Sequence, residues 1–290
     1  MKKIVKLGGA FFLFGTLLMS TVIIWLSGML AAPSPAEIGM PPVELHAYDV
    51  SFHSESGVLI RGWYIPGTVV DAAIVLMHGN GGNRLRMLSR AKFLSDAGYP
   101  LLLFDFQAHG ESAGSHKTFG YLEKFDAQAA VDFIRNYTSA VKIGIIGTSL
   151  GGAATLLCGK DLEIDAAVLE AVYPTIEEAV QNRLHIKLGS IGPYLTNIHL
   201  LQMKPRLGFH PDALRPIDFI GAITYPVFII AGTEDKRTTI KESKALYDGA
   251  QQPKEFWAIE GAAHEDFYIL KSTEYERKVL SFFSHYLFNE

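Results

Sequence analysis

A serine, an acid and a histidine in this chain each follow a short apolar run, in an order that suits nucleophilic catalysis. The serine lies in the pentapeptide GTSLG, residues 147–151, and the acid and histidine are Asp235 and His264. A serine hydroxyl becomes a nucleophile only beside a base, and that base needs an orienting carboxylate. The spacing therefore predicts acyl transfer through Ser149, with His264 as the base and Asp235 as the orienting acid.

Other side chains compete for these roles. Glu234 adjoins Asp235, and Glu170 ends another apolar run, so each is an alternative acid. His78 lies in a Gly-rich turn, where we expect a structural role rather than a base. Cys158 is expected to be a small buried side chain rather than a second nucleophile.

An oxyanion also needs backbone N–H groups directed at it. The segment MHGNGGN, residues 77–83, follows an apolar run and can turn its amides inward. We therefore assign the oxyanion hole to the N–H groups of Asn80 and Leu150. A phosphate-binding loop is the alternative, but no Gly-Lys-Ser/Thr follows and the three-glycine dinucleotide spacing is absent.

Composition excludes several other functions. The net charge of −4 and the absence of long basic runs make nucleic acid an unexpected partner. The one cysteine cannot form an intrachain disulfide. The His264-Glu265-Asp266 stretch lacks the second histidine of a zinc-protease motif, so no metal and no cofactor are expected.

Short apolar runs alternate with helical periodicity over the rest of the chain. This alternation predicts a mostly parallel central sheet with helices on both faces, and such sheets carry their sites at the carboxyl ends of the strands. Two alternating segments, 43–52 and 58–65, predict an antiparallel hairpin before it. The buried strands are predicted at 73–77, 101–104, 143–146, 166–169, 227–230 and 256–259.

One interval is too long for a single connecting helix. Residues 175–215 separate two predicted strands and contain many apolar side chains. We interpret them as a small inserted helical cap, whose apolar residues either line a substrate pocket or merely cover the sheet.

The N-terminus has a different composition. A short basic segment, residues 1–6, precedes 26 uncharged residues at 7–32, a run that spans about 39 Å as a helix and exceeds a hydrocarbon core of roughly 30 Å. This pattern predicts a transmembrane signal-anchor with the N-terminus cytoplasmic and the remainder extracytoplasmic. A cleaved signal peptide, giving a secreted or periplasmic protein, is the alternative.

Proline is frequent after this run. Residues 33–42 contain four prolines and are expected to form a semi-rigid spacer. The catalytic domain is then expected to occupy residues 43–290.

Five segments carry a resemblance to a known family: MHGNGGN, DFQAHGES, GTSLGG, GTEDKRTT and EGAAHEDF. From residue 43 onward the chain resembles the α/β-hydrolase superfamily, and most of all single-domain hydrolases of the Bem46 and ABHD13 type. The resemblance implies an α/β-hydrolase fold and a serine hydrolase. Such proteins usually have arginine where this chain has Gln107 and an aromatic residue where it has His109, so His109 is either a loop histidine or a substrate contact.

The expected activity is hydrolysis of a carboxylic ester of a small acyl substrate through an acyl-enzyme. Thioesters and peptide or amide bonds are the alternatives within the same fold. A membrane-anchored binding protein without turnover is the alternative outside it.

Overall fold

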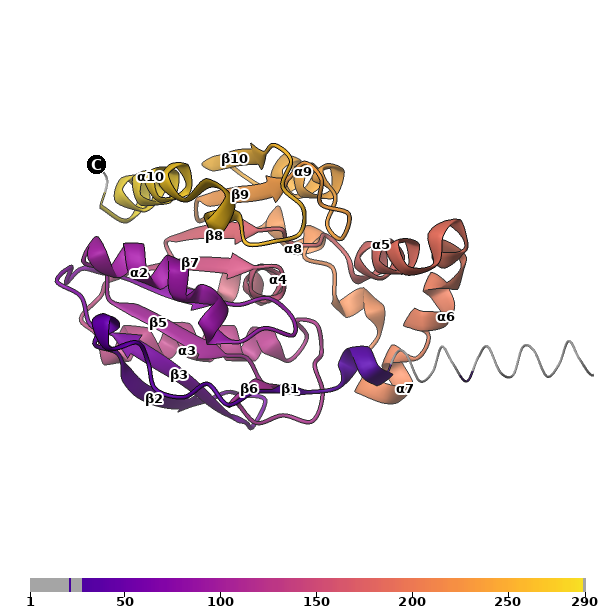
Figure 1. Cartoon of the computed structure of the whole chain (residues 1–290), viewed down its shortest axis with the longest axis horizontal. Coiled ribbons are helices and arrows are strands. Elements are labelled where there is room, and N and C mark those ends of the chain that lie inside the picture. The colour runs from indigo at the N-terminus through magenta and orange to yellow at the C-terminus, as the bar shows by residue number, and fades with distance from the viewer. Residues whose placement is uncertain (1–20, 22–27, 289–290) are drawn as a thin grey trace, which may run out of the picture.

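The computed structural model describes Thr21 and residues 28–288. In this part of the chain, eight strands form one sheet in the order β10-β9-β8-β7-β4-β5-β3-β2. Neighbouring strands from β10 to β5 are parallel, whereas β3 is antiparallel to both β5 and β2. The strands are β2 (Tyr48–His53), β3 (Leu59–Ile65), β4 (Ala72–Met77), β5 (Leu101–Asp105), β7 (Lys142–Thr148), β8 (Ala166–Glu170), β9 (Val227–Gly232) and β10 (Lys254–Ile259). The predicted parallel sheet and leading hairpin are therefore confirmed (Figure 1).

Two predicted strands differ in detail. The first hairpin strand begins at Tyr48 rather than at Val43, because Val43–Leu45 forms a 3₁₀ turn after Pro42. The prediction that the last strand is buried on both faces is wrong. In β10 only Ile259 is fully buried, because this strand forms the edge of the sheet and has a neighbour on one side only.

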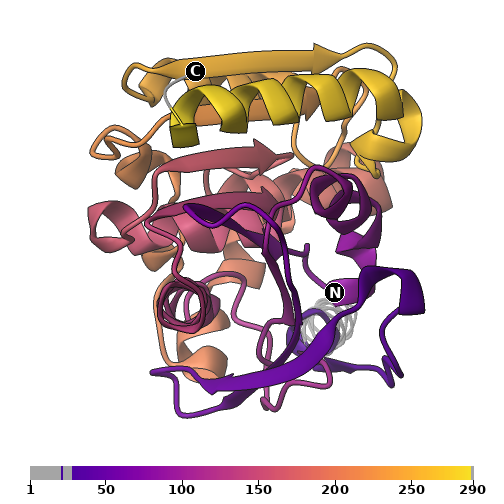
Figure 2. The same ribbon diagram turned by 90° about the vertical axis from the view of Figure 1, so that its left-hand side faces the viewer.

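Helices cover both faces of the sheet (Figure 2). Apolar side chains of α2 and α10 pack on one face, and those of α3, α4, α8 and α9 pack on the other. These helices are α2 (Leu88–Asp96), α3 (Glu123–Tyr137), α4 (Leu150–Cys158), α8 (Ile217–Ile220), α9 (Ile240–Gly249) and α10 (Phe267–Phe288). The two helical layers bury both faces of the central strands, so a functional site is expected at the carboxyl ends of these strands.

A helical insertion lies between β8 and β9. It consists of α5 (Ile176–Leu188), a 3₁₀ segment (Gly189–Leu195), α6 (Thr196–Leu200) and α7 (Met203–Leu207). The Thr175 hydroxyl accepts the N–H of Glu178 and so caps the start of α5. These helices stand to one side of the sheet (Figure 1) and occupy the interval in which the cap is expected.

The segment before the hairpin contacts the domain. Residues 28–31 are helical, and Ala31 is buried. Its carbonyl accepts the N–H of Lys117, and β1 (Ser34–Pro35) pairs in parallel with β6 (His109–Gly110). The Pro-rich segment is therefore attached to the domain near its start, and Figure 1 shows the short helix before it beside α7.

Most of the predicted membrane-spanning run, residues 7–32, lies outside the described residues, which include only Thr21 and residues 28–32 of it. Within Thr21 and residues 28–288, no helix combines the length and the apolar character needed to cross a bilayer.

Candidate active site

Ser149 occupies a sharp turn between β7 and α4. Its backbone φ of 51° lies in the left-handed region, which residues other than glycine rarely adopt. The N–H of Ser149 donates to the carbonyl of Glu170 on the next strand, at 2.7 Å. A Cβ on Gly151 would lie 2.4 Å from the carbonyl oxygen of Met77, and one on Gly147 would lie 2.6 Å from a backbone nitrogen. The two motif glycines are therefore required for the close approach of α4 to the sheet.

The loops after β9 and β10 bring the acid and the histidine together. Oδ2 of Asp235 lies 2.7 Å from Nδ1 of His264, and the Asp235 carboxylate is fully buried. Its other oxygen, Oδ1, accepts the N–H groups of Arg237 and Thr238 at 2.7 and 2.9 Å. Because a carboxylate can only accept here, Nδ1 of His264 carries the proton and Nε2 is the basic nitrogen.

Ser149 and His264 line the same cleft. In the described part of the chain, no hydrogen bond joins the hydroxyl of Ser149 to the imidazole. The structure thus forms the acid–histidine contact and leaves the hydroxyl of Ser149 without a hydrogen bond to the imidazole among the described residues.

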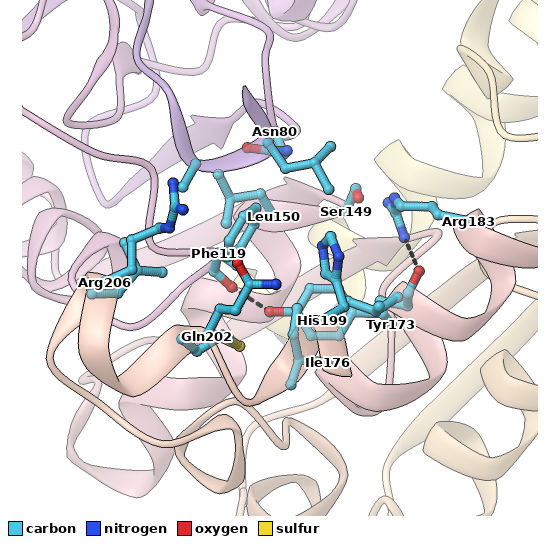
Figure 3. Close-up of a pocket in the computed structure, with 16 residues that line it drawn as sticks. Asn80, Phe119, Ser149, Leu150, Tyr173, Ile176, Arg183, His199, Gln202 and Arg206 are labelled. Atoms are coloured by element: carbon cyan, nitrogen blue, oxygen red, sulfur yellow. Dashed lines mark hydrogen bonds between the residues drawn. The ribbon is translucent and has the colours of Figure 1, made fainter. Parts of the chain in front are cut away.

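The two residues predicted to form the oxyanion hole, Asn80 and Leu150, line the same pocket as Ser149. Asn80 lies in a turn closed by the N–H of Gly82 donating to the carbonyl of Gly79. Leu150 is the first residue of α4, a position whose N–H has no partner within a helix. Among the described residues, neither N–H has an acceptor, so both are available to an oxyanion. Figure 3 shows Asn80 and Leu150 with Ser149 at the wall of one pocket.

This pocket is lined mostly by apolar side chains, as small-molecule sites usually are. The cap supplies much of its wall, so the cap lines a pocket and does more than cover the sheet. The lining residues are Leu30, Ala31, Asn80, Phe119, Ser149, Leu150, Tyr173, Ile176, Ala179, Val180, Arg183, His199, Gln202, Met203, Arg206 and Leu207.

A second, polar cleft meets the apolar pocket at Asn80, Ser149 and Arg183. Its lining residues are Gly79, Asn80, Gly81, Gly82, Arg86, Met87, Arg90, Thr148, Ser149, Ala171, Arg183, Arg237, His264, Glu265 and Asp266. Ser149 therefore lies where an apolar pocket and a cleft rich in arginine join. A substrate whose reacting carbon lies at Ser149 would extend one part into the apolar pocket and another part into the polar cleft.

His78 and His109, the other two histidines considered from the sequence, have structural positions. His78 donates from Nδ1 to the carbonyl of Gly79 and accepts the N–H of Phe106 at Nε2. Burial lowers the pKa of His78 to about 4, so the ring is neutral near pH 7. His109 is fully buried and lines neither the pocket nor the cleft, which leaves it no substrate contact here. Burial, together with the nearby His78, lowers the pKa of His109 to about 3.

The alternative acids occupy other positions. Glu170 is buried in an ion pair with Arg90 and also accepts the hydroxyl groups of Thr148 and Tyr275. Glu234 is exposed. Neither contacts the imidazole of His264, whereas Asp235 does.

Cys158 is not placed for nucleophilic catalysis. Its thiol donates to the carbonyl of Lys124, and burial raises the pKa of the thiol to about 12. It is therefore protonated and unreactive near pH 7. Among Thr21 and residues 28–288, no three His, Cys, Asp or Glu side chains gather as a metal site requires.

Sequence reasoning missed several residues of the site. Arg183 projects from α5, and Arg237 follows Asp235 by two positions. Leu30 and Ala31 belong to the run predicted to span the membrane, yet they line the apolar pocket.

Comparisons with known proteins agree with this architecture. The family profile described as "Serine aminopeptidase, S33" matches residues 68–209, a little under half of the chain. The protein YqkD of Bacillus subtilis is 26% identical over 233 residues, which cover 79% of this chain and 76% of YqkD. The lysophosphatidylserine lipase ABHD12 of Mus musculus is 32% identical over 128 residues, 41% of this chain and 32% of that protein.

A solved structure extends the similarity to the fold. The esterase Pf2001 of Pyrococcus furiosus superposes with a TM-score of 0.74 and 23% identity, covering 88% of this chain and 99% of that one. The strand order, the serine turn and the similarity to this esterase structure together show that the chain has the α/β-hydrolase fold.

Proposed function

We propose that this protein is a serine esterase that cleaves carboxylic esters with an aliphatic acyl chain. The observation that carries the proposal is the position of Ser149 at the wall of an apolar pocket. There it shares the pocket with Asn80 and Leu150, whose N–H groups have no acceptor among the described residues, and it shares a cleft with His264, which Asp235 holds. An acyl chain in that pocket would present its carbonyl carbon to the hydroxyl of Ser149.

The proposed reaction has two halves. Ser149 Oγ attacks the acyl carbon while Nε2 of His264 takes its proton, and the N–H groups of Asn80 and Leu150 stabilise the oxyanion. The imidazolium then gives the proton to the departing alcohol, which leaves an acyl-serine. Water, activated by the same nitrogen, attacks this ester and releases the carboxylic acid and free Ser149. Asp235 keeps the proton of His264 on Nδ1 throughout.

The pocket favours an ester over the peptide suggested by the name of the matching family. An aminopeptidase must hold the free ammonium group of its substrate, and a carboxylate is the side chain suited to that task. Among the described residues, no acidic side chain lines the apolar pocket. In the adjoining cleft, Asp266 is paired with Arg90, and Oε1 of Glu265 accepts the N–H of Ala263. An uncharged aliphatic acyl group fits this lining better than a peptide N-terminus does.

The location proposed for the enzyme follows from the N-terminal composition. The part of the predicted run 7–32 that precedes residue 28 would anchor the chain in a membrane, because Leu30 and Ala31 line the pocket, and the domain would lie on the extracytoplasmic side. Cysteine labelling at residues placed before and after this run, in intact and opened cells, tests the orientation. Cleavage of the run would instead appear as a shortened mature chain in mass spectrometry.

Hydrolysis of p-nitrophenyl esters with acyl chains of 2 to about 12 carbons tests the activity. We expect turnover in the wild type, loss of at least about 10³-fold in kcat for Ser149→Ala, and no loss for the exposed Ser115→Ala. A fluorophosphonate probe should label the wild type and Ser115→Ala but not Ser149→Ala. Equal turnover of Ser149→Ala, or preferential cleavage of an aminoacyl p-nitroanilide, would contradict the proposal.

A further inference from the structure

Two arginines beside Ser149 have no role in the reaction described above. Arg183 lines both the apolar pocket and the polar cleft, and Arg237 lines the cleft. Nη1 of Arg183 donates to the carbonyl of Ala179 on its own helix, at 2.8 Å (Figure 3). In the described part of the chain, no carboxylate lies within 4 Å of either guanidinium group.

The surroundings of Arg183 leave its charge incompletely balanced. Burial lowers the pKa of Arg183, and the charge of Arg237 lowers it further. Tyr173, Asp235 and Glu242 act in the opposite direction without forming an ion pair with it. Since both oxygens of Asp235 already accept hydrogen bonds, that carboxylate cannot turn toward Arg183 without losing His264 or the loop N–H groups.

The acidic residues of the cleft are also engaged. Asp266 forms an ion pair with Arg90, and Oε1 of Glu265 accepts the N–H of Ala263. The cleft thus has an excess of guanidinium groups in a protein whose net charge is −4. Guanidinium groups are planar and present parallel N–H donors that match the oxygens of phosphate and carboxylate groups.

We propose that Arg183 and Arg237 bind an anionic group on the alcohol part of the ester substrate. This inference rests on the proposed function, and it adds the substrate class: an ester with an aliphatic acyl chain and a phosphate or carboxylate on its leaving alcohol. Ser149 lies at the junction of the two spaces, so the acyl chain occupies the apolar pocket while the alcohol extends into the cleft.

A matched pair of substrates tests the inference. We compare 1-lauroylglycerol 3-phosphate with 1-lauroylglycerol, below their micellar concentrations, and use the lauroyl ester of glyceric acid to separate phosphate from carboxylate. In the wild type we expect kcat/KM to be at least about tenfold higher for an anionic ester than for the neutral one. Raising the salt concentration should reduce this ratio.

The arginine variants assign the effect to its residues. Arg183→Gln and Arg237→Gln should each lower the anionic-to-neutral ratio by about tenfold, and the double variant should bring the ratio close to one. Arg277→Gln is the matched control, since Arg277 is exposed on α10 and lines neither space; its ratio should equal that of the wild type. Because Arg237 is exposed, its replacement tests the inference even if Arg183→Gln folds poorly.

A binding measurement separates this inference from the proposed function. Ser149→Ala cannot form the acyl-serine, so calorimetry with dodecyl phosphate reports anion binding without turnover. Affinity that falls about tenfold when Arg237→Gln is added supports the subsite even if no ester is hydrolysed. A ratio near one in the wild type, or a ratio and an affinity unchanged in both arginine variants, would overturn the inference while leaving neutral ester hydrolysis intact.

Discussion

Asp235 holds His264 through one carboxylate oxygen, at 2.7 Å from Nδ1, while its other oxygen accepts the N–H groups of Arg237 and Thr238. The loop after β9 therefore fixes the carboxylate before substrate arrives. The imidazole of His264 keeps a partly exposed edge, with 16% of its side chain accessible, whereas the acid has none. The buried carboxylate of Asp235 thus orients the imidazole through Nδ1, and the exposed part of the ring is accessible from the cleft.

Asp235→Asn tests this relationship. An amide can donate to Nδ1 and so stabilise the wrong tautomer of His264, which places the proton on Nε2. We expect kcat for a p-nitrophenyl ester to fall by about 10³–10⁴-fold with little change in melting temperature. Glu234→Gln, at the exposed neighbouring acid, is the control and should retain wild-type turnover. Equal losses in the two variants would remove Asp235 from its assigned role.

A buried network supports the serine turn and the histidine loop together. Arg90 pairs with Glu170, whose carbonyl accepts the N–H of Ser149, and also with Asp266, two residues after His264. Burial opposes the charge of Arg90, but the Glu170 carboxylate raises the pKa of Arg90 well above its usual value.

Arg90→Gln should therefore destabilise the fold strongly, because it leaves the carboxylate of Glu170 buried without its cation. We expect a loss of about 3–5 kcal/mol in the free energy of unfolding, measured by urea denaturation. Adding Glu170→Gln should recover part of that loss. Lys92→Gln removes the exposed pair with Asp96 and should cost less than about 1 kcal/mol. A similar small cost for Arg90→Gln would contradict the structural role of this network.

The buried His109 makes stability depend on pH. Its pKa is about 3 in the folded chain, because burial and the neighbouring His78 disfavour the imidazolium, against roughly 6.5 when unfolded. As pH falls from about 6.5 toward 3, the unfolded chain binds the extra proton, so this histidine lowers the free energy of unfolding by about 1.4 kcal/mol per pH unit.

His109→Gln isolates this contribution. Asp126, whose pKa burial raises to about 7, titrates over the same range with the opposite sign, so only the difference between wild type and variant is informative. Any stability advantage of the wild type at pH 7 should shrink by about 1–2 kcal/mol at pH 5. Urea denaturation at both pH values measures it, and a difference that does not change with pH would contradict a neutral buried His109.

A substitution at Ala31 tests whether the apolar pocket binds the acyl chain. Ala31→Phe adds a ring to a buried position on the pocket wall and should leave less room for a long acyl chain. We expect the ratio of kcat/KM for a dodecanoyl ester to that for an acetyl ester to fall about tenfold. The neighbouring Ala32→Phe, outside the pocket lining, should keep the wild-type ratio. Equal ratios in the two variants would place the acyl chain elsewhere.

The central fold and the grouping of the candidate site residues at one edge of the sheet could be predicted because their signals are local. Each strand is a short apolar run, and Ser149, Asp235 and His264 each lie within a few residues of the end of one. Parallel strands bring these ends to one edge of the sheet, so order along the chain was enough to group the residues. The surroundings of the edge strand β10 were not predictable, because its apolar run does not reveal how many neighbours the strand has.

The pocket could not be predicted because its contacts are not local. The position of Arg183 in α5 does not indicate that it lines the same pocket as Ser149, because that depends on how the cap is placed over the sheet. Leu30 and Ala31 lie near the end of a hydrophobic run, and such a run suits the interior of a bilayer as well as the wall of an apolar pocket. Only the packing of the chain shows that this end of the run also meets the cap.

The attachment of Ala31 has a consequence for how such an enzyme can diverge. Its carbonyl is held by the N–H of Lys117, and Ser34 is held by the strand at His109, so residues 31–34 have a fixed register against the domain. An insertion or deletion between the hydrophobic run and Ser34 would move Leu30 and Ala31 along the pocket. An evolutionary change in the length of this segment would therefore also alter the pocket in which the proposed function places the acyl chain.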